Sequence, residues 1–144
     1  MTSRGQPGKR TRQETLASLL ALAPRLPGPW FTSSAYISLA PVVVRAAHAE
    51  WIVHVSAHAV RKHLANPPEF EFAVILTIRG NKLPRSESGL SQVRKWQRGI
   101  TSKLRDLGYG GRWAPGGPFA YFSKDVDSLA RIPATVRKLQ QVRF

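Results

Sequence analysis

Two histidines four residues apart, His54 and His58, are the first side chains whose spacing suggests chemistry. If their segment is a helix, they lie one turn apart, a spacing that metal-ligand pairs often use. If it is a strand, both side chains point to the same face. The residue after His54 is Val55, so the HExxH pattern of metalloproteases is absent. We therefore expect no metal site here.

Three further patterns fall short of what catalysis requires. Asp125 and Asp127 resemble a magnesium-binding pair, but carboxylates in the first turn of a helix are better explained by the helix dipole. Tyr109 and Tyr121 could be strand-transfer nucleophiles, as in rolling-circle replication initiators, but the paired-histidine strand motif of that chemistry is missing. Residues 108–111 lack the Gly-Lys-Ser/Thr ending of a phosphate loop, and there is no cysteine nucleophile. We expect a protein that is not an enzyme and needs no cofactor, and a metal-dependent nuclease or strand-transfer enzyme remains an alternative.

Positive charge is the strongest signal in the composition. Lysine and arginine total 22 against 8 aspartates and glutamates, a formal net charge of +14 over 144 residues. A field of this sign speeds association with polyanions and opposes self-association. Arginine supplies 15 of the 22 cations, and its planar fork grips a phosphate with two hydrogen bonds. We therefore expect nucleic acid as the partner, ahead of an anionic membrane or an acidic protein.

A row of arginines lies on the clearest predicted helix, residues 90–107. Its apolar residues recur at three- and four-residue steps and form one narrow seam: Leu90, Val93, Trp96, Ile100, Leu104 and Leu107. Arg94, Arg98 and Arg105 align on a side turned away from that seam, with Lys95 nearby. Gly108 is a typical C-terminal stop. The pattern predicts a basic helix face that contacts phosphates.

The first half of the chain suggests a winged helix-turn-helix. Helices over about 14–24, 40–50 and 56–65, followed by a strand over 69–79, have the order that this DNA-binding form requires. The strand prediction is the best in the chain, because apolar residues alternate from Phe70 to Ile78. Predicted DNA contacts come from the short third helix and from the wing: His58, Arg61, Lys62, Arg79, Lys82 and Arg85.

The segment 51–60 also allows a second interpretation. Ser56 is a natural N-cap, and Asn66 followed by two prolines would end a helix over 57–64. Yet Trp51, Val53 and Val55 alternate with more polar residues, as in a strand. The sequence leaves helix and strand open here, and the winged-helix hypothesis requires the helix.

A predicted hairpin follows the arginine helix. Residues 112–114 and 119–122 flank a Pro-Gly-Gly turn, and Arg112 adds another candidate phosphate contact. Trp113, Phe119 and Tyr121 could stack on unpaired bases, which would suit RNA or single strands. Aromatic side chains in strands more often belong to the core. The hairpin is the basis of an alternative, RNA-binding hypothesis.

The chain ends add two predicted helices and an arm. Ser123 would cap a helix holding Val126 and Leu129, and Pro133 would begin a last helix with Arg137 and Lys138 outside. We expect three parts: a disordered basic arm over 1–12, a winged-helix-like module over 13–85 and a helix-hairpin-helix module over 86–144.

Together these patterns predict an α+β protein of several short helices and a small antiparallel sheet. The expected partner is nucleic acid, with DNA favoured over RNA and with other proteins of a nucleoprotein assembly as further candidates. No segment is long and apolar enough to cross a bilayer, and the basic N-terminus has no apolar stretch that would make it a signal peptide. We expect no membrane partner and a cytoplasmic location.

Overall fold

The protein is an α+β fold in which helices pack against a seven-stranded antiparallel sheet. The computed structural model describes residues 11–26, 28–61, 66, 70–115 and 117–144. The α-helices of this part are α1 (Arg12–Leu22), α2 (Glu87–Asp106) and α3 (Ile132–Gln140), with short 3₁₀ turns η2 (Ala23–Arg25) and η3 (Leu129–Arg131). None of these helices is both long enough and apolar enough to cross a membrane.

Two long neighbouring strands, β4 and β5, form the centre of the sheet. The strands are β1 (Trp30–Thr32), β2 (Tyr36–Leu39), β3 (Val42–Ala46), β4 (Ala49–Arg61), β5 (Phe70–Lys82), β6 (Gly110–Trp113) and β7 (Phe119–Val126). Their order across the sheet is β1-β2-β4-β5-β7-β6, and β3 pairs with the first part of β4. Every pairing is antiparallel.

The alternation of apolar residues along β4 and β5 produces one buried face. Val53, Val55 and Ala57 of β4 lie opposite Ile78, Leu76 and Val74 of β5. Burying one apolar side chain of this size stabilises the fold by about 1.5–3 kcal/mol. The next strand, β7, adds Ala120 and Phe122 to the same face, and both are fully buried.

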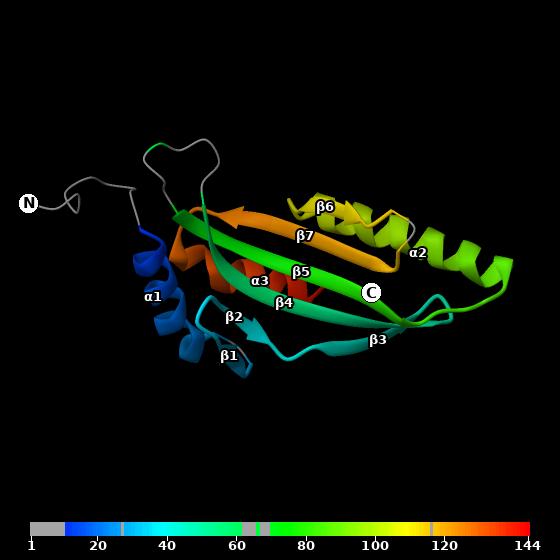
Figure 1. The fold of residues 1–144 in the computed structure, drawn as a ribbon, viewed down its shortest axis with the longest axis horizontal. Coiled ribbons are helices and arrows are strands. Elements are labelled where there is room, and N and C mark those ends of the chain that lie inside the picture. The colour runs from blue at the N-terminus through cyan, green and yellow to red at the C-terminus, as the bar shows by residue number, and fades with distance from the viewer. Residues whose placement is uncertain (1–10, 27, 62–65, 67–69, 116) are drawn as a thin grey trace, which may run out of the picture.

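All three helices cover this buried face. Leu19 of α1, Leu104 of α2 and Val136 of α3 belong to one core cluster together with Leu76 and Phe122 of the sheet. Each of the three helical side chains is inaccessible to solvent. Figure 1 shows α3 lying behind β4 and β5. No helix of the described part covers the opposite face of the sheet.

Three tryptophans fix α2 against the sheet. Trp96 of α2 stacks on Trp51 of β4 with 4.5 Å between ring centroids, and Trp113 of β6 meets Trp51 edge-on at 5.5 Å. The Trp113 indole Nε1 donates hydrogen bonds to the Gln97 carbonyl oxygen at 3.2 Å and to Thr101 Oγ1 at 3.1 Å. Trp113 is therefore a packing residue that holds β6 beside α2.

Several elements confirm the prediction from the sequence. The helix predicted over 90–107 is α2, whose N-cap Ser86 accepts a hydrogen bond from the Gly89 backbone nitrogen. Gly108 follows with φ +93°, the left-handed conformation expected of a C-terminal stop. The strand predicted over 69–79 is β5, the hairpin is β6 and β7, and the last helix is α3 with Pro133 in its first turn.

Two predicted helices are wrong within the described residues. Residues 40–50 form β3, a turn and the start of β4, and residues 56–61 continue β4 instead of forming a helix. Residues 62–65 lie outside the described part. The second and third helices of the predicted winged helix-turn-helix are therefore strands as far as Arg61, whereas the first, over about 14–24, corresponds to α1 and η2. The winged form is not confirmed. Strand pairing explains why this segment is not helical, because each residue of β4 from Trp51 to Arg61 has a partner on β5.

The helix predicted from Ser123 is also wrong. Ser123 lies within β7, opposite Ile75, and β7 continues to Val126 opposite Phe72. Asp125 is therefore a strand residue, and its position is not explained by a helix dipole. Seven strands also make the sheet larger than the small one that we expected.

The predicted basic arm falls mostly outside the description. Residues 1–10 are not described, and within the described part Arg12 is already the first residue of α1. Thr11 caps this helix by accepting a hydrogen bond from the Glu14 backbone nitrogen.

Candidate nucleic-acid interface

The face of the sheet away from the helices, called the open face below, carries aromatic and basic side chains in rows. The register aligns His54 of β4, Thr77 of β5, Tyr121 of β7 and Arg112 of β6 across four strands. Side chains in one such row point the same way. Strands lie about 4.8 Å apart, so the row brings an imidazole, a phenol ring and a guanidinium within about 15 Å.

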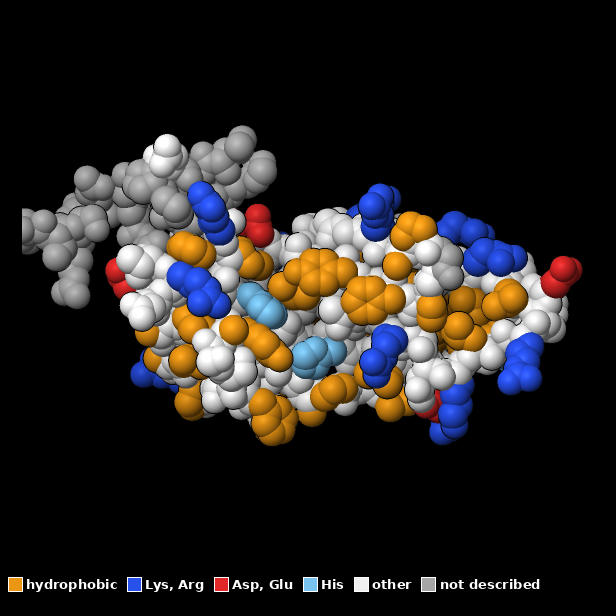
Figure 2. Space-filling view, viewed as in Figure 1, with side chains coloured by type: hydrophobic (Ala, Val, Ile, Leu, Met, Phe, Trp, Pro, Cys, Tyr) orange, Lys and Arg blue, Asp and Glu red, His pale blue; other side chains and the backbone are white. Residues whose placement is uncertain are grey.

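A second row lies two residues further along the strands. It joins Ile52 of β4, Arg79 of β5 and Phe119 of β7. Phe119 and Tyr121 remain 41% and 47% exposed, which is high for rings on strands of a packed sheet. Figure 2 shows aromatic rings and histidines uncovered across this face, with Lys and Arg side chains along its edge over α2. The open face is thus a solvent-exposed surface of rings and cations.

Further along β4, side chains of the open face pack against one another. His58 stacks on Tyr36 of β2 with 4.7 Å between ring centroids, and its Nε2 is hydrogen bonded to Ser56 Oγ at 2.8 Å. Burial, and next the nearby His54, lower the pKa of His58 below its usual value of 6.5. His58 was predicted to contact DNA from an exposed helix, whereas the structure packs it between two partners on a strand.

A basic groove runs beside the open face, between α2 and β6. Arg94, Arg98 and Arg105 line this groove of about 610 Å³, and Trp113 forms part of its wall. All three arginines are exposed. They occur at steps of four and seven residues, so α2 presents them on one side over about 16 Å. Sequence reasoning predicted this alignment, and the structure adds that it forms one wall of a groove.

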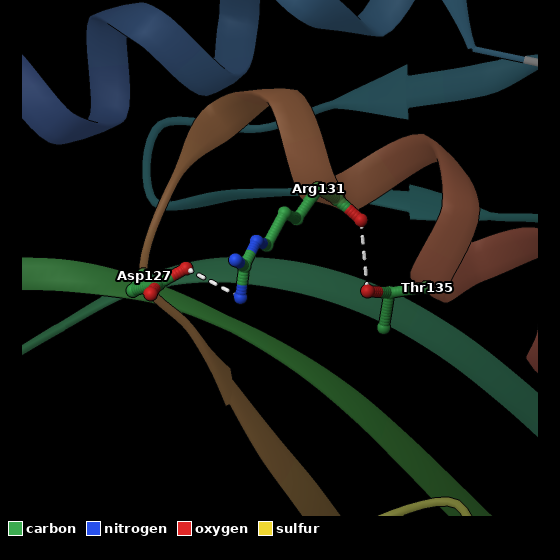
Figure 3. A network of polar contacts seen from close by, with 3 residues as sticks. All are labelled: Asp127, Arg131 and Thr135. Carbon is green, nitrogen blue, oxygen red and sulfur yellow. Dashed lines mark hydrogen bonds and ion pairs between the residues drawn. The ribbon is translucent and has the colours of Figure 1, made fainter.

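Within the described part of the chain, the cations of this surface form no ion pair, although Asp106 also lines the groove. Among the described residues one ion pair forms, between Arg131 Nη1 and Asp127 Oδ1 at 3.4 Å, and both side chains are about 70% exposed. Figure 3 shows it beside the hydrogen bond from Thr135 Oγ1 to the Arg131 carbonyl oxygen. Such an exposed pair contributes little to stability. Both members of this pair lie in the connection between β7 and α3. The pair therefore leaves the arginines of α2 available for other anions.

The other predicted contacts are dispersed. Arg61 and Lys82 lie at the ends of β4 and β5, and Arg85 lies in the loop before α2. Lys95 is on α2 but lines a different pocket with Trp96. Arg137 and Lys138 are on α3, and Lys62 lies outside the described residues. The structure thus separates these from the two sets that it brings together, the arginines of the groove and the cations Arg79 and Arg112 of the open face.

Sequence reasoning missed two residues of the open face, Tyr36 and Phe31. Phe31 of β1 lies opposite Ser38 and is 59% exposed. The aromatic content of this segment was the available signal, but nothing in it indicated the β1–β2 hairpin. Ser33 builds that turn, because its Oγ accepts hydrogen bonds from the backbone nitrogens of Ala35 and Tyr36.

The structure gives the surroundings of the residues considered for metal binding and of Tyr109. Among the described residues no three of His, Asp and Glu are grouped closely enough to hold a metal ion. Tyr109 is 4% exposed beside a pocket of about 390 Å³, and its hydroxyl has no hydrogen-bond partner in the described part. Burial raises the pKa of Tyr109 to about 12. A phenol with a raised pKa is a poor nucleophile near neutral pH.

Comparison of the chain with models of protein families, with curated proteins and with solved structures finds no match. The interpretation of the open face and of the α2 groove therefore follows from their own geometry and charge.

Proposed function

We propose that this protein binds nucleic acid, and that the groove between α2 and β6 contacts phosphates through Arg94, Arg98 and Arg105. The observation that carries the proposal is the arrangement of these three exposed guanidiniums along one wall of a groove. Among the residues that the structure describes, none of the three forms an ion pair. An arginine without a carboxylate partner keeps all five of its donors for a ligand.

The charge of the whole chain supports the same partner. With a net charge of +14, the protein attracts polyphosphates before any contact forms. Each phosphate neutralised by an arginine releases condensed cations, which supplies most of the binding free energy at low salt. The cytoplasm is where we propose that the protein meets its nucleic acid, alone or with other proteins of an assembly.

The mode of binding that we propose differs from a winged helix-turn-helix. That mode would need an exposed recognition helix near residues 56–65, and β4 occupies the first six of these positions. Contacts from α2 would be made mainly to phosphates, so they would not by themselves distinguish DNA from RNA.

The test is the double variant Arg94→Ala with Arg98→Ala, measured by fluorescence anisotropy with a labelled oligonucleotide. We expect the affinity to fall about tenfold or more, and the slope of log K against log salt to shrink by about 2. The matched control is Arg12→Ala with Arg25→Ala, which removes the same charge from exposed positions on α1 and η2. Equal losses in both double variants would show that only net charge matters, and the proposed groove would be wrong.

A further inference from the structure

We infer that the open face binds single-stranded nucleic acid, with unpaired bases stacked on Tyr121 and Phe119 and phosphates held by Arg79 and Arg112. The inference rests on the proposed nucleic-acid-binding function and specifies the form of nucleic acid that this face takes.

The exposed rings are the first reason. Phe119 and Tyr121 alternate with buried residues along β7. No helix of the described part covers their side of the sheet. The described part of the chain leaves both more than 40% exposed. Contiguous exposed aromatic surface on a soluble protein marks an interaction site. The two residues lie about 7 Å apart on the same side of β7, so each can take a separate base.

Besides the arginines, the residues of the open face around and beyond Tyr121 include small ones. Thr77 stands between Tyr121 and His54, and Ala73 stands between Asp125 and His58. Ser56 and Ala73 are almost fully buried at the floor of this face. On the side of Tyr121 that faces β5, the short side chain of Thr77 leaves the ring accessible to a flat base.

The alternation of rings and cations favours a nucleic acid over a second protein. Arg79 lies directly opposite Phe119, and Arg112 lies directly opposite Tyr121. A chain of bases and phosphates matches such a pattern with π-faces and negative charges in turn. Two copies of this chain would instead bring like charges together. The carboxylates of Asp125 and Glu71 lie toward the other end of the sheet, so the path follows the arginine end.

The α2 groove continues this path. Arg112 of β6 faces the open side, and the next residue, Trp113, lines the groove with Arg94 and Arg98. A strand crossing β7 and β6 would pass from the rings to the arginines without leaving the basic surface. In a duplex the bases are stacked on each other and their faces are not accessible to Tyr121, so duplex binding would use the groove alone.

The experiment compares labelled probes by fluorescence anisotropy: single-stranded DNA, single-stranded RNA of the same sequence, the DNA duplex, and an abasic strand with the same phosphates. For the unmodified protein we expect single strands to bind about tenfold tighter than the duplex or the abasic strand. Tyr121→Ala and Phe119→Ala should each weaken single-strand binding about tenfold and leave the abasic strand unaffected. Tyr121→Phe, which keeps the ring, should retain wild-type affinity.

Val43→Ala is the control, because Val43 is 57% exposed on β3 and has no π-face. Thermal unfolding checks that each variant is folded. If single strands, duplex and abasic strand bind equally, and Tyr121→Ala matches Val43→Ala, the stacking surface is refuted while binding through α2 stands. If no probe binds, the proposed function itself fails. If Tyr121→Ala instead changes the sedimentation of the protein alone, the open face is a contact between copies and the inference is overturned.

Discussion

The Tyr36 ring lies on the His58 imidazole, with 4.7 Å between ring centroids and 17° between ring planes. The two residues are direct partners across β2 and β4, so the stack ties a short strand to one of the two long central strands. Such a pair stabilises a structure by about 0.5–1.5 kcal/mol beyond its buried area. It also fixes a ring at the end of the open face away from the arginines.

This environment predicts how stability depends on pH. The pKa of His58 is lower in the folded protein than in the unfolded chain, so the unfolded chain binds the proton first as pH falls. The stability that the neutral imidazole contributes is present above pH 6.5 and is lost below it. We expect the free energy of unfolding, measured with urea, to fall between pH 7.5 and pH 5 by more in the wild type than in His58→Phe. An identical fall in both proteins would contradict the assigned environment.

Alanine substitutions at the neighbouring residues Gly110 and Gly111 should differ strongly in their effect on stability. The φ of Gly111 is +139°, and a Cβ there would collide with the Tyr121 carbonyl oxygen and lie 2.8 Å from the Phe122 Cα. We expect Gly111→Ala to lower the free energy of unfolding by about 2 kcal/mol or more, because β6 could no longer approach β7. Gly110→Ala is the matched control, since a Cβ at Gly110 meets nothing within 4 Å. Equal effects in urea denaturation would contradict the β6–β7 geometry.

Tyr109 predicts a change in stability at high pH. Its pKa rises from 10.0 to about 12 on burial, so between these values the unfolded chain loses the phenol proton first. The stability that the protonated Tyr109 contributes to the folded protein is complete below pH 10 and is lost by about pH 12. At pH 8 we expect the free energy of unfolding of Tyr109→Phe to equal that of the wild type or to exceed it by up to about 1 kcal/mol. The substitution removes a buried hydroxyl that has no hydrogen-bond partner among the described residues.

At pH 11 the advantage of Tyr109→Phe should grow. Tyr121→Phe, at an exposed position, serves as the control and should show no such growth. A constant difference between Tyr109→Phe and wild type from pH 8 to pH 11, followed by chemical denaturation, would contradict the burial of the Tyr109 hydroxyl.

The β3–β4 turn predicts a stabilising substitution. Ala47 and His48 connect the strands with φ +53° and φ +57°, the left-handed conformation that costs an ordinary residue about 1–2 kcal/mol. We expect His48→Gly to raise the free energy of unfolding by about 1 kcal/mol. Ser34→Gly in the β1–β2 turn, where φ is not positive, should lower it slightly. The reverse order in thermal unfolding would show that the turn is not strained.

That turn also explains why part of the fold could not be predicted. The segment Val42–Trp51 contains no glycine, asparagine or proline after Pro41 to mark a hairpin, and its alanines favour a helix. Val44 pairs with Trp51 and Ala46 with Ala49 across the turn, and β4 in turn pairs with the distant strand β5 from Trp51 to Arg61. Local propensity does not contain this information. By contrast α2 and β5 carry strong local periodicity, and both were predicted correctly.

The candidate site also has a part that local sequence patterns predict and a part that depends on strand register. The arginine alignment on α2 follows from helical spacing alone, so Arg94, Arg98 and Arg105 could be found from the sequence. The open face needs the register of β4, β5, β7 and β6, which brings His54, Tyr121 and Arg112 into one row. The exposure of Phe119 and Tyr121 likewise depends on which face the helices cover. Trp113, the third predicted stacking residue, lies on the opposite side of β6, in the tryptophan cluster.

The most direct test of the account is the affinity of the purified protein for a single-stranded oligonucleotide as salt is varied around physiological ionic strength. The contacts proposed for the α2 groove and the open face predict measurable binding. Its log K should fall linearly with log salt, with a slope that reflects several phosphate contacts. Absence of binding to any DNA or RNA probe under these conditions, or an affinity independent of salt, would contradict the proposal that this protein binds nucleic acid.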